Sequence, residues 1–294
     1  MRKRMTLLLS ILLLAGCAAE EAEEAAVPEL FSPEVAVEEV QPEIFTYRVK
    51  TGVWEDAAQD DDGTLLVSYR FLLPELQVLR EDGTTLETAD TDEARAAAET
   101  AEAFNSHFGK WAAAEEFPEI ADSAAADLAL SREWESEWAG PYELELICDV
   151  YQTEGLVSVA GTYYSFTGGA HPNTWQLGWN FDLENGDFFG PEGLAADSAA
   201  FQEAMVAELV RQAGEIAAEN GMAPEDMFWP DYESILANWS SYAVSFDENG
   251  MTVVFSPYEL AAYAYGPQEF SFSYDWLLPH LSDHGRQVLG LSGT

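Results

Sequence analysis

The chain has 294 residues, of which 54 are acidic and 12 are basic, so its formal net charge at pH 7 is −42. This excess of carboxylates excludes nucleic acid as a partner, because contacts with phosphate need lysine and arginine. It also disfavours direct electrostatic binding to anionic lipid head groups. The length is sufficient for one large domain or two small ones with a hydrophobic core.

The N-terminus has the pattern of a bacterial lipoprotein signal. Three basic residues are followed by an apolar run and by a Leu-Ala-Gly-Cys lipobox that ends at Cys17. The run is too short to span a bilayer permanently. We therefore expect removal of residues 1–16, acylation of Cys17, and a chain anchored by lipid to the outer face of the cytoplasmic membrane in a Gram-positive-type envelope. The alternative is a plain secretory signal with an accidental cysteine.

Residues 17–43 predict a tether rather than a folded element. They consist mainly of glutamate, alanine, valine and proline and include no basic residue. Such a composition buries too little apolar surface to fold, and repulsion between its charges keeps it extended.

The folded part begins near residue 44 with two predicted strands, residues 44–54 and 65–72. Between them, three consecutive aspartates and a glycine indicate a turn. The aspartates suggest calcium, but the alternating ligands and closing glutamate of an EF-hand are absent, so no metal site is predicted.

A helix is predicted over residues 91–117, with Asp90 as its N-cap and Glu93 three residues later. Apolar residues recur along it at spacings of three and four, which is typical of a face that packs on a core. This stripe consists of Ala94, Ala97, Ala101, Phe104, Phe108 and Trp111.

The later elements complete an α+β pattern. Strands are expected at residues 142–151, 156–166 and 174–183, a helix at 198–219, and a hairpin at 242–246 and 251–255. Because runs of strands are separated by single helices, helices packed on mostly antiparallel sheets are favoured over a parallel βαβ series.

Cys148 belongs to the alternating apolar face of the first of these strands and is interpreted as a small buried hydrophobe. With Cys17 acylated, it has no partner for a disulfide within the chain.

Two segments carry candidate recognition residues. In the first, an aromatic strand leads into Gly168 and Gly169, which permit positive φ, and then into His171 and Pro172. The second, residues 256–266, contains three tyrosines and one carboxylate, and tyrosine-rich loops make good recognition surfaces. The candidate ligand-binding residues are Tyr163, Tyr164, Phe166, Gly168, Gly169, His171, Asn173, Tyr258, Glu259, Tyr263 and Tyr265.

These segments resemble a known receptor type. The Thr-Gly-Gly-Ala-His-Pro-Asn run, the Asn-Phe-Asp-Leu sequence at residues 180–183 and the Pro-Tyr-Glu-Leu segment at residues 257–260 occur in that order. Together they resemble the extracellular, lysozyme-receptor domain of RsiV-type anti-sigma factors and the non-catalytic part of PdaC-type peptidoglycan deacetylases. The resemblance covers roughly residues 44–282 and is strongest in the second half, although residues 188–200 fit it poorly. It implies an α+β domain in two parts, residues 44–165 and 166–282, followed by a tail, residues 283–294.

A catalytic site is not expected. Ser165, His171 and Asp182 suggest a triad, but the sequence has no Gly-x-Ser-x-Gly elbow, and its scattered histidines form no metal motif. We expect no cofactor. The favoured hypothesis is a non-catalytic extracytoplasmic recognition domain that binds a basic protein such as lysozyme. The alternatives are an enzyme that acts on cell-wall glycan and an accessory subunit of an envelope complex.

Overall fold

The computed structural model describes residues 43–291, which fall within one compact unit. The expected signal peptide, Cys17 and nearly all of the tether lie outside the described residues. Within residues 43–291, no helix is both long enough and apolar enough to cross a membrane.

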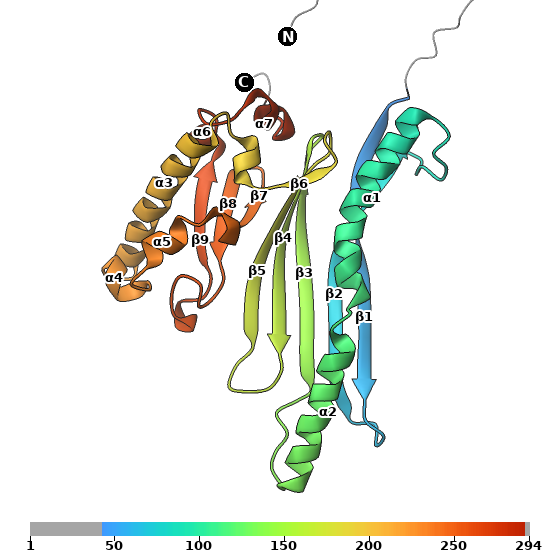
Figure 1. Ribbon diagram of the computed structural model, residues 1–294, viewed down its shortest axis with the longest axis vertical. Coiled ribbons are helices and arrows are strands. Elements are labelled where there is room, and N and C mark those ends of the chain that lie inside the picture. Colours follow the sequence, from blue (N-terminus) through green and yellow to red (C-terminus); the bar gives the residue numbers. More distant parts are fainter. Residues whose placement is uncertain (1–42, 292–294) are drawn as a thin grey trace, which may run out of the picture. The chain divides into compact units, whose positions relative to one another are not determined.

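The first layer is a six-stranded sheet whose strands are paired in chain order (Figure 1). All neighbours are antiparallel except β2 and β3, which are parallel. The first two strands are longer than the sequence predicts, whereas the next three agree to within one residue. The strands are β1 (Phe45–Gln59), β2 (Leu65–Arg80), β3 (Tyr142–Gln152), β4 (Leu156–Phe166), β5 (Asn173–Asp182) and β6 (Asp187–Phe189).

Two helices, α1 (Asp92–Ala113) and α2 (Phe117–Glu133), connect β2 to β3 and allow that pair to run parallel. The expected single helix to residue 117 and its expected cap are both wrong. Thr91 is the N-cap, because its side chain accepts a hydrogen bond from Ala94 N. The helix stops at Ala114, which has a φ of +46°, and a second helix begins with a proline in its first turn, where no backbone donor is needed.

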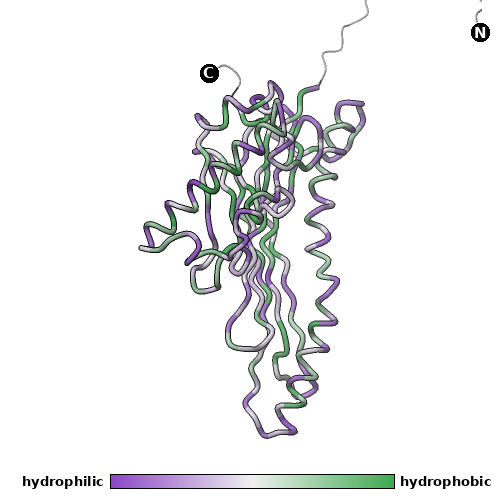
Figure 2. Tube along the Cα trace, turned by 60° about the vertical axis from the view of Figure 1, so that its left-hand side comes forward, coloured by the Kyte–Doolittle hydropathy of each residue, from purple (hydrophilic) through white to green (hydrophobic). Residues whose placement is uncertain are grey.

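The predicted stripe of α1 packs on the sheet. Ala94, Ala97, Ala101, Phe104 and Phe108 are buried. Figure 2 shows hydrophobic and hydrophilic residues alternating along this helical segment. Phe104 is fully buried and contacts the rings of Phe181, Phe188 and Phe108.

The second layer follows β6 and contains α3 (Ser198–Glu219), whose predicted bounds are confirmed. Asp197 caps its N-terminus by accepting hydrogen bonds from two backbone amides. A three-stranded antiparallel sheet packs with α3, and several short helices surround it. These elements are α4 (Pro224–Met227), α5 (Tyr232–Leu236), β7 (Ala243–Phe246), β8 (Gly250–Phe255), β9 (Gln268–Ser273), α6 (Tyr274–Leu277) and α7 (Asp283–Val288).

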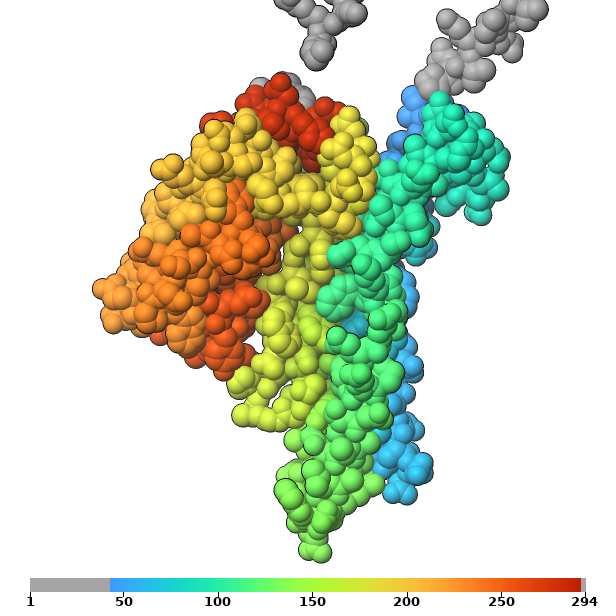
Figure 3. Space-filling view, in the orientation of Figure 1, coloured from blue at the N-terminus to red at the C-terminus, as the bar shows by residue number. Residues whose placement is uncertain are grey.

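The helices α1 and α2 and the second layer cover opposite faces of the large sheet. Val157 and Val159 of β4 belong to the core beneath α1, whereas the alternate residue Leu156 belongs to the core of the second layer. Figure 3 shows α1 and α2, in green, on one side of the yellow-green strands and the orange and red segments on the other. The fold is therefore α+β with mostly antiparallel sheets, as the sequence predicts. The expected boundary after residue 165 falls within β4, one residue before its end, and β4 pairs with β5 over ten residue pairs.

Cys148 is buried in β3, as predicted. Burial, followed by the charge of Asp149, raises the pKa of its thiol to about 12. At neutral pH it therefore remains a thiol and acts as a small apolar side chain.

Candidate functional site

The Gly-Gly loop joins β4 to β5. Gly168 and Gly169 have φ values of +86° and +100°, which explains why glycine is needed at both positions. Beyond them, Nδ1 of His171 lies 2.9 Å from the carbonyl oxygen of Pro172. Donation by Nδ1–H to that oxygen leaves Nε2 as the hydrogen-bond acceptor of the ring.

The tyrosine loop joins β8 to β9 and is held by Trp229, a residue that sequence analysis missed. The indole Nε1–H of Trp229 donates to the carbonyl oxygen of Tyr258 at 2.9 Å. Tyr258 has a φ of +74°, a conformation that is costly for a bulky residue, yet its side chain is 52% exposed. Backbone strain at a residue whose side chain is exposed is typical of functional loops. No local sequence signal identifies Trp229, because its contact depends on how the two loops fold together.

The structure brings the two segments together in what we call the loop cluster, formed by His171, Tyr258 and Tyr263. The ring of His171 stacks on that of Tyr263 with centroids 4.1 Å apart and planes 19° apart. The hydroxyl of Tyr258 lies 3.3 Å from Nε2 of His171, the distance of a weak hydrogen bond, and the two tyrosine rings are 5.4 Å apart. Residues more than 80 positions apart in the sequence therefore form one aromatic surface.

Backbone contacts support this arrangement. The amide of Gln176 on β5 donates to the hydroxyl of Ser256 at 3.0 Å. Glu259 accepts a hydrogen bond from Ser256 N at 2.6 Å, so this candidate ligand residue closes its own loop. Beside the cluster lies an open hollow of about 350 Å³ that Thr174, Pro257 and Tyr263 help to line.

Other candidate residues lie elsewhere. Tyr163 is on the face of β4 that meets α1, where its ring lies 5.5 Å from Trp111. Tyr164 and Phe166 are half-buried on the opposite face of that strand. Tyr265 is 37% exposed and its hydroxyl points to the sulfur of Met222 at 3.3 Å. Asn173 begins β5 opposite Ser165.

The suggested triad does not form. Asp182 pairs with His284 of α7, its Oδ2 being 2.6 Å from Nε2 of that ring, and it also accepts two backbone hydrogen bonds. Ser165 is buried, with 9% of its surface exposed. This geometry gives Asp182 and His284 the role of fastening α7 to the end of β5.

The aspartates after β1 form an ion-paired turn. Asp60 Oδ1 accepts hydrogen bonds from the amides of Asp62 and Thr64, and its Oδ2 lies 2.8 Å from Arg132 of α2. Those hydrogen bonds, with that of Thr64 first, lower the pKa of Asp60. Over residues 43–291, no group of three or more histidine, cysteine, aspartate or glutamate side chains is placed to hold a metal ion.

Comparison with known proteins found solved structures that resemble this one and a family model that matches part of the chain. Solved structures include a DUF3298 family member from Bacteroides fragilis, which superposes with a TM-score of 0.59 at 13% identity and covers 84% of this chain and 98% of its own. A DUF3298 family protein from Pseudomonas aeruginosa gives a TM-score of 0.48 at 16% identity and covers 81% of this chain and 95% of its own. No curated protein matches the chain.

The segment of this chain that matches a family model begins in the turn before β6 and ends at the start of α6. The names of the two solved structures and of the family mention neither RsiV-type receptors nor PdaC-type deacetylases, so the resemblance to those proteins stays a prediction. Residues 186–275 match the model of DUF3298, a protein family of unknown function.

Proposed function

We propose that the chain is a surface-anchored bacterial lipoprotein whose folded domain recognises a basic protein, such as a lysozyme, without catalysing a reaction. The observation that carries this proposal is the loop cluster, in which two distant segments present stacked aromatic side chains at the surface. Tyrosine and histidine rings on braced loops supply rigid contact area with polar tips, which suits recognition of a protein surface.

Charge supports the choice of a basic partner. The chain carries 54 acidic and only 12 basic residues. A field of this sign increases the rate of encounter with a cationic protein, and the increase falls as salt rises. The contact surface itself must then supply binding that persists at physiological salt.

Titration calorimetry with a lysozyme at physiological salt tests the recognition step. We expect saturable one-to-one binding with a Kd of about 1 μM or tighter. Tyr263→Ala should weaken it by about tenfold or more, because stacked aromatic residues at the centre of an interface carry much of its energy. Trp134→Ala is the matched control, since Trp134 is a highly exposed aromatic residue at the end of α2. Binding that vanishes at physiological salt, or equal losses in both variants, would contradict the proposal.

The anchor has its own test. Cys17→Ala should release the protein from the membrane fraction, because the acyl chains can no longer be attached. Equal retention of the variant and the unaltered protein in that fraction would rule the lipid anchor out.

A purified sample incubated with peptidoglycan tests the non-catalytic part of the proposal. We expect no released or modified muropeptides. Turnover that His171→Ala abolishes would favour an enzyme that acts on cell-wall glycan.

A further inference from the structure

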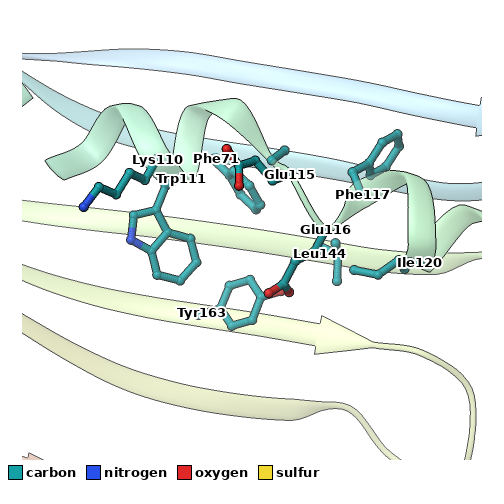
Figure 4. Close-up of a pocket in the computed structure, with 10 residues that line it drawn as sticks. Phe71, Lys110, Trp111, Glu115, Glu116, Phe117, Ile120, Leu144 and Tyr163 are labelled. Carbon is teal, nitrogen blue, oxygen red and sulfur yellow. The ribbon is translucent and has the colours of Figure 1, made fainter. Parts of the chain in front are cut away.

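The break between α1 and α2 opens a pocket over the large sheet. Ala114 turns the chain out of α1 in a left-handed conformation, and α2 restarts at Phe117. Beneath the break lies a cavity of about 330 Å³, whose lining includes Phe71, Trp111 and Tyr163. Figure 4 shows these side chains below the helix break. We call this cavity the helix-break pocket.

Its position explains why the pocket is not filled by the core. The core beneath α1 and the smaller core beneath α2 are separate clusters, and Ile120 touches both. Where the two helices part they leave a hollow over the sheet, although Phe71 and Leu144 in its lining are buried. A cavity of this size lies at the lower end of the range that small ligands occupy.

Three aromatic rings form its walls. Phe71 meets Trp111 edge to face, with centroids 6.3 Å apart and planes 89° apart. Tyr163 lies 5.5 Å from Trp111 at 57° and 6.4 Å from Phe71 at 61°. Because these rings are steeply inclined to one another, they do not form the flat platform on which a sugar ring stacks. The face of an aromatic ring at the pocket attracts organic cations.

Two carboxylates lie at the rim, on Glu115 and Glu116. Neither side chain has a hydrogen-bond or ion-pair partner within residues 43–291, and the Glu116 side chain does not cap α2. Figure 4 shows the carboxylate of Glu116 beside the ring of Tyr163. Burial, followed by the charge of Glu116, raises the pKa of Tyr163, so this negative charge acts at the pocket.

The one cationic side chain at the pocket does not neutralise these carboxylates. Lys110 extends away from both of them in Figure 4. It forms no ion pair with any residue in the described range.

We propose that the helix-break pocket binds the basic side chain of a polypeptide, with the guanidinium or ammonium group against the rings of Trp111 and Tyr163 and paired with Glu116. The apolar stem of such a side chain matches the apolar lining, and its charge matches the unpaired carboxylates. This site is separate from the loop cluster, because Tyr163 faces α1 and the loop cluster does not include that side chain. The proposal therefore stands whether or not the loop cluster binds a protein.

The test is an NMR titration of the full-length protein with Nα-acetyl-arginine methylamide, which carries one positive charge. The signal to follow is the indole N–H of Trp111, assigned by comparison with Trp111→Phe. We expect saturation with a Kd of about 0.1–1 mM, the affinity usual for a ligand of this size. The citrulline analogue, which has the same shape but no charge, should bind at least about tenfold more weakly, a difference of about 1.4 kcal/mol.

Matched variants locate the site. Glu116→Gln should weaken arginine binding about tenfold. Glu119→Gln should leave it unchanged, because Glu119 lies on the next part of α2 and does not line the pocket. Tyr263→Ala should also leave it unchanged. Thermal melts of each variant confirm folding, and the two glutamate variants decide the question even if Trp111→Phe fails to fold.

Four outcomes would overturn the proposal. They are absence of saturation at about 20 mM ligand, a concentration well above the expected range; equal binding of arginine and citrulline; equal effects of Glu116→Gln and Glu119→Gln; and saturation by an N-acetylglucosamine oligomer in place of the arginine ligand. The last outcome would identify a sugar site.

Discussion

The two faces of the six-stranded sheet are covered in different ways. On one face, α1 packs with aromatic and alanine side chains, and Phe104 meets a cluster of other phenylalanine rings. On the other face, β7 approaches so closely that its backbone contacts the sheet directly. Asn180 donates to the carbonyl of Val244 at 3.0 Å, and Ser158 accepts from Phe246 N at 2.7 Å.

This difference shows how an edge strand can be buried. The backbone groups of β7 that point at the large sheet need partners, because an unpaired buried polar group is costly. Ser158 and Asn180 supply those partners and are linked to each other at 2.8 Å. The helix has no such need, because its backbone hydrogen bonds are internal, and apolar side chains are enough.

The largest expected effect comes from Gly178→Ala. A Cβ added there would lie 2.3 Å from the carbonyl oxygen and 2.4 Å from the amide nitrogen of Val244, so the backbone of β7 must move. We expect a loss of about 4 kcal/mol or more in the free energy of unfolding, at the extreme of single substitutions. Gly214→Ala on α3, where nothing lies within 4 Å, is the control and should stabilise by about 0.5–1 kcal/mol. Urea denaturation measures both, and similar values would contradict the close contact.

On the helical face, Phe104→Ala should cost about 3–5 kcal/mol, because it removes a fully buried ring and leaves a cavity. Denaturant midpoints give the value. Leu130→Ala at an exposed position of α2 serves as the reference and should change stability by less than about 0.5 kcal/mol. A small cost for Phe104→Ala would mean that α1 is not tightly packed.

Asn180→Ala should cost about 1–3 kcal/mol, because the carbonyl of Val244 and the hydroxyl of Ser158 both lose a buried partner. A double-mutant cycle with Ser158→Ala separates their linkage from each residue's own contact with β7. Strictly additive losses would show that the two side chains act independently.

The smallest effect concerns pH. His107 is half-buried against Phe108, Trp179 and Phe188, and burial lowers the pKa of its ring. Because the unfolded chain then binds a proton more readily than the folded one, stability falls as pH drops below the unfolded value of about 6.5. His107→Phe should therefore lose less thermal stability than the unaltered protein between pH 7.5 and pH 5. His171→Phe, on an exposed loop, is the comparison, and an unchanged pH slope in His107→Phe would refute the assignment.

How far the sequence could predict the structure depended on how local each signal was. The bounds of α3 were predicted correctly because its apolar period and the Asn-Gly stop at residues 220–221 lie within one segment. In contrast, α2 was missed because only Ala124 and Leu128 of its 17 residues are buried, which leaves a weak periodic signal. β9 was not predicted, although it alternates regularly between buried and exposed positions, and it pairs with residues of β8 that lie 13 to 23 positions away.

The candidate site likewise has features that the sequence predicted and features that it could not predict. Both loops were identified from their glycines, tyrosines and turn residues, and the positive φ values of Gly168 and Gly169 follow from the residue type alone. Their contact through His171 and Tyr263 was not predictable, since it depends on how β5 and β8 are placed in two different layers.

By itself, the sequence determined the α+β class, the main helices and strands, the burial of Cys148 and the two candidate loops, because propensity, periodicity and turn chemistry are local properties. Only the tertiary structure decided the parallel pairing of β2 with β3, the close approach of Val244 to Gly178, and the placement of Glu116 beside Tyr163. Each of these joins residues distant in the chain, and their contacts are fixed by packing and by the pairing of buried polar groups.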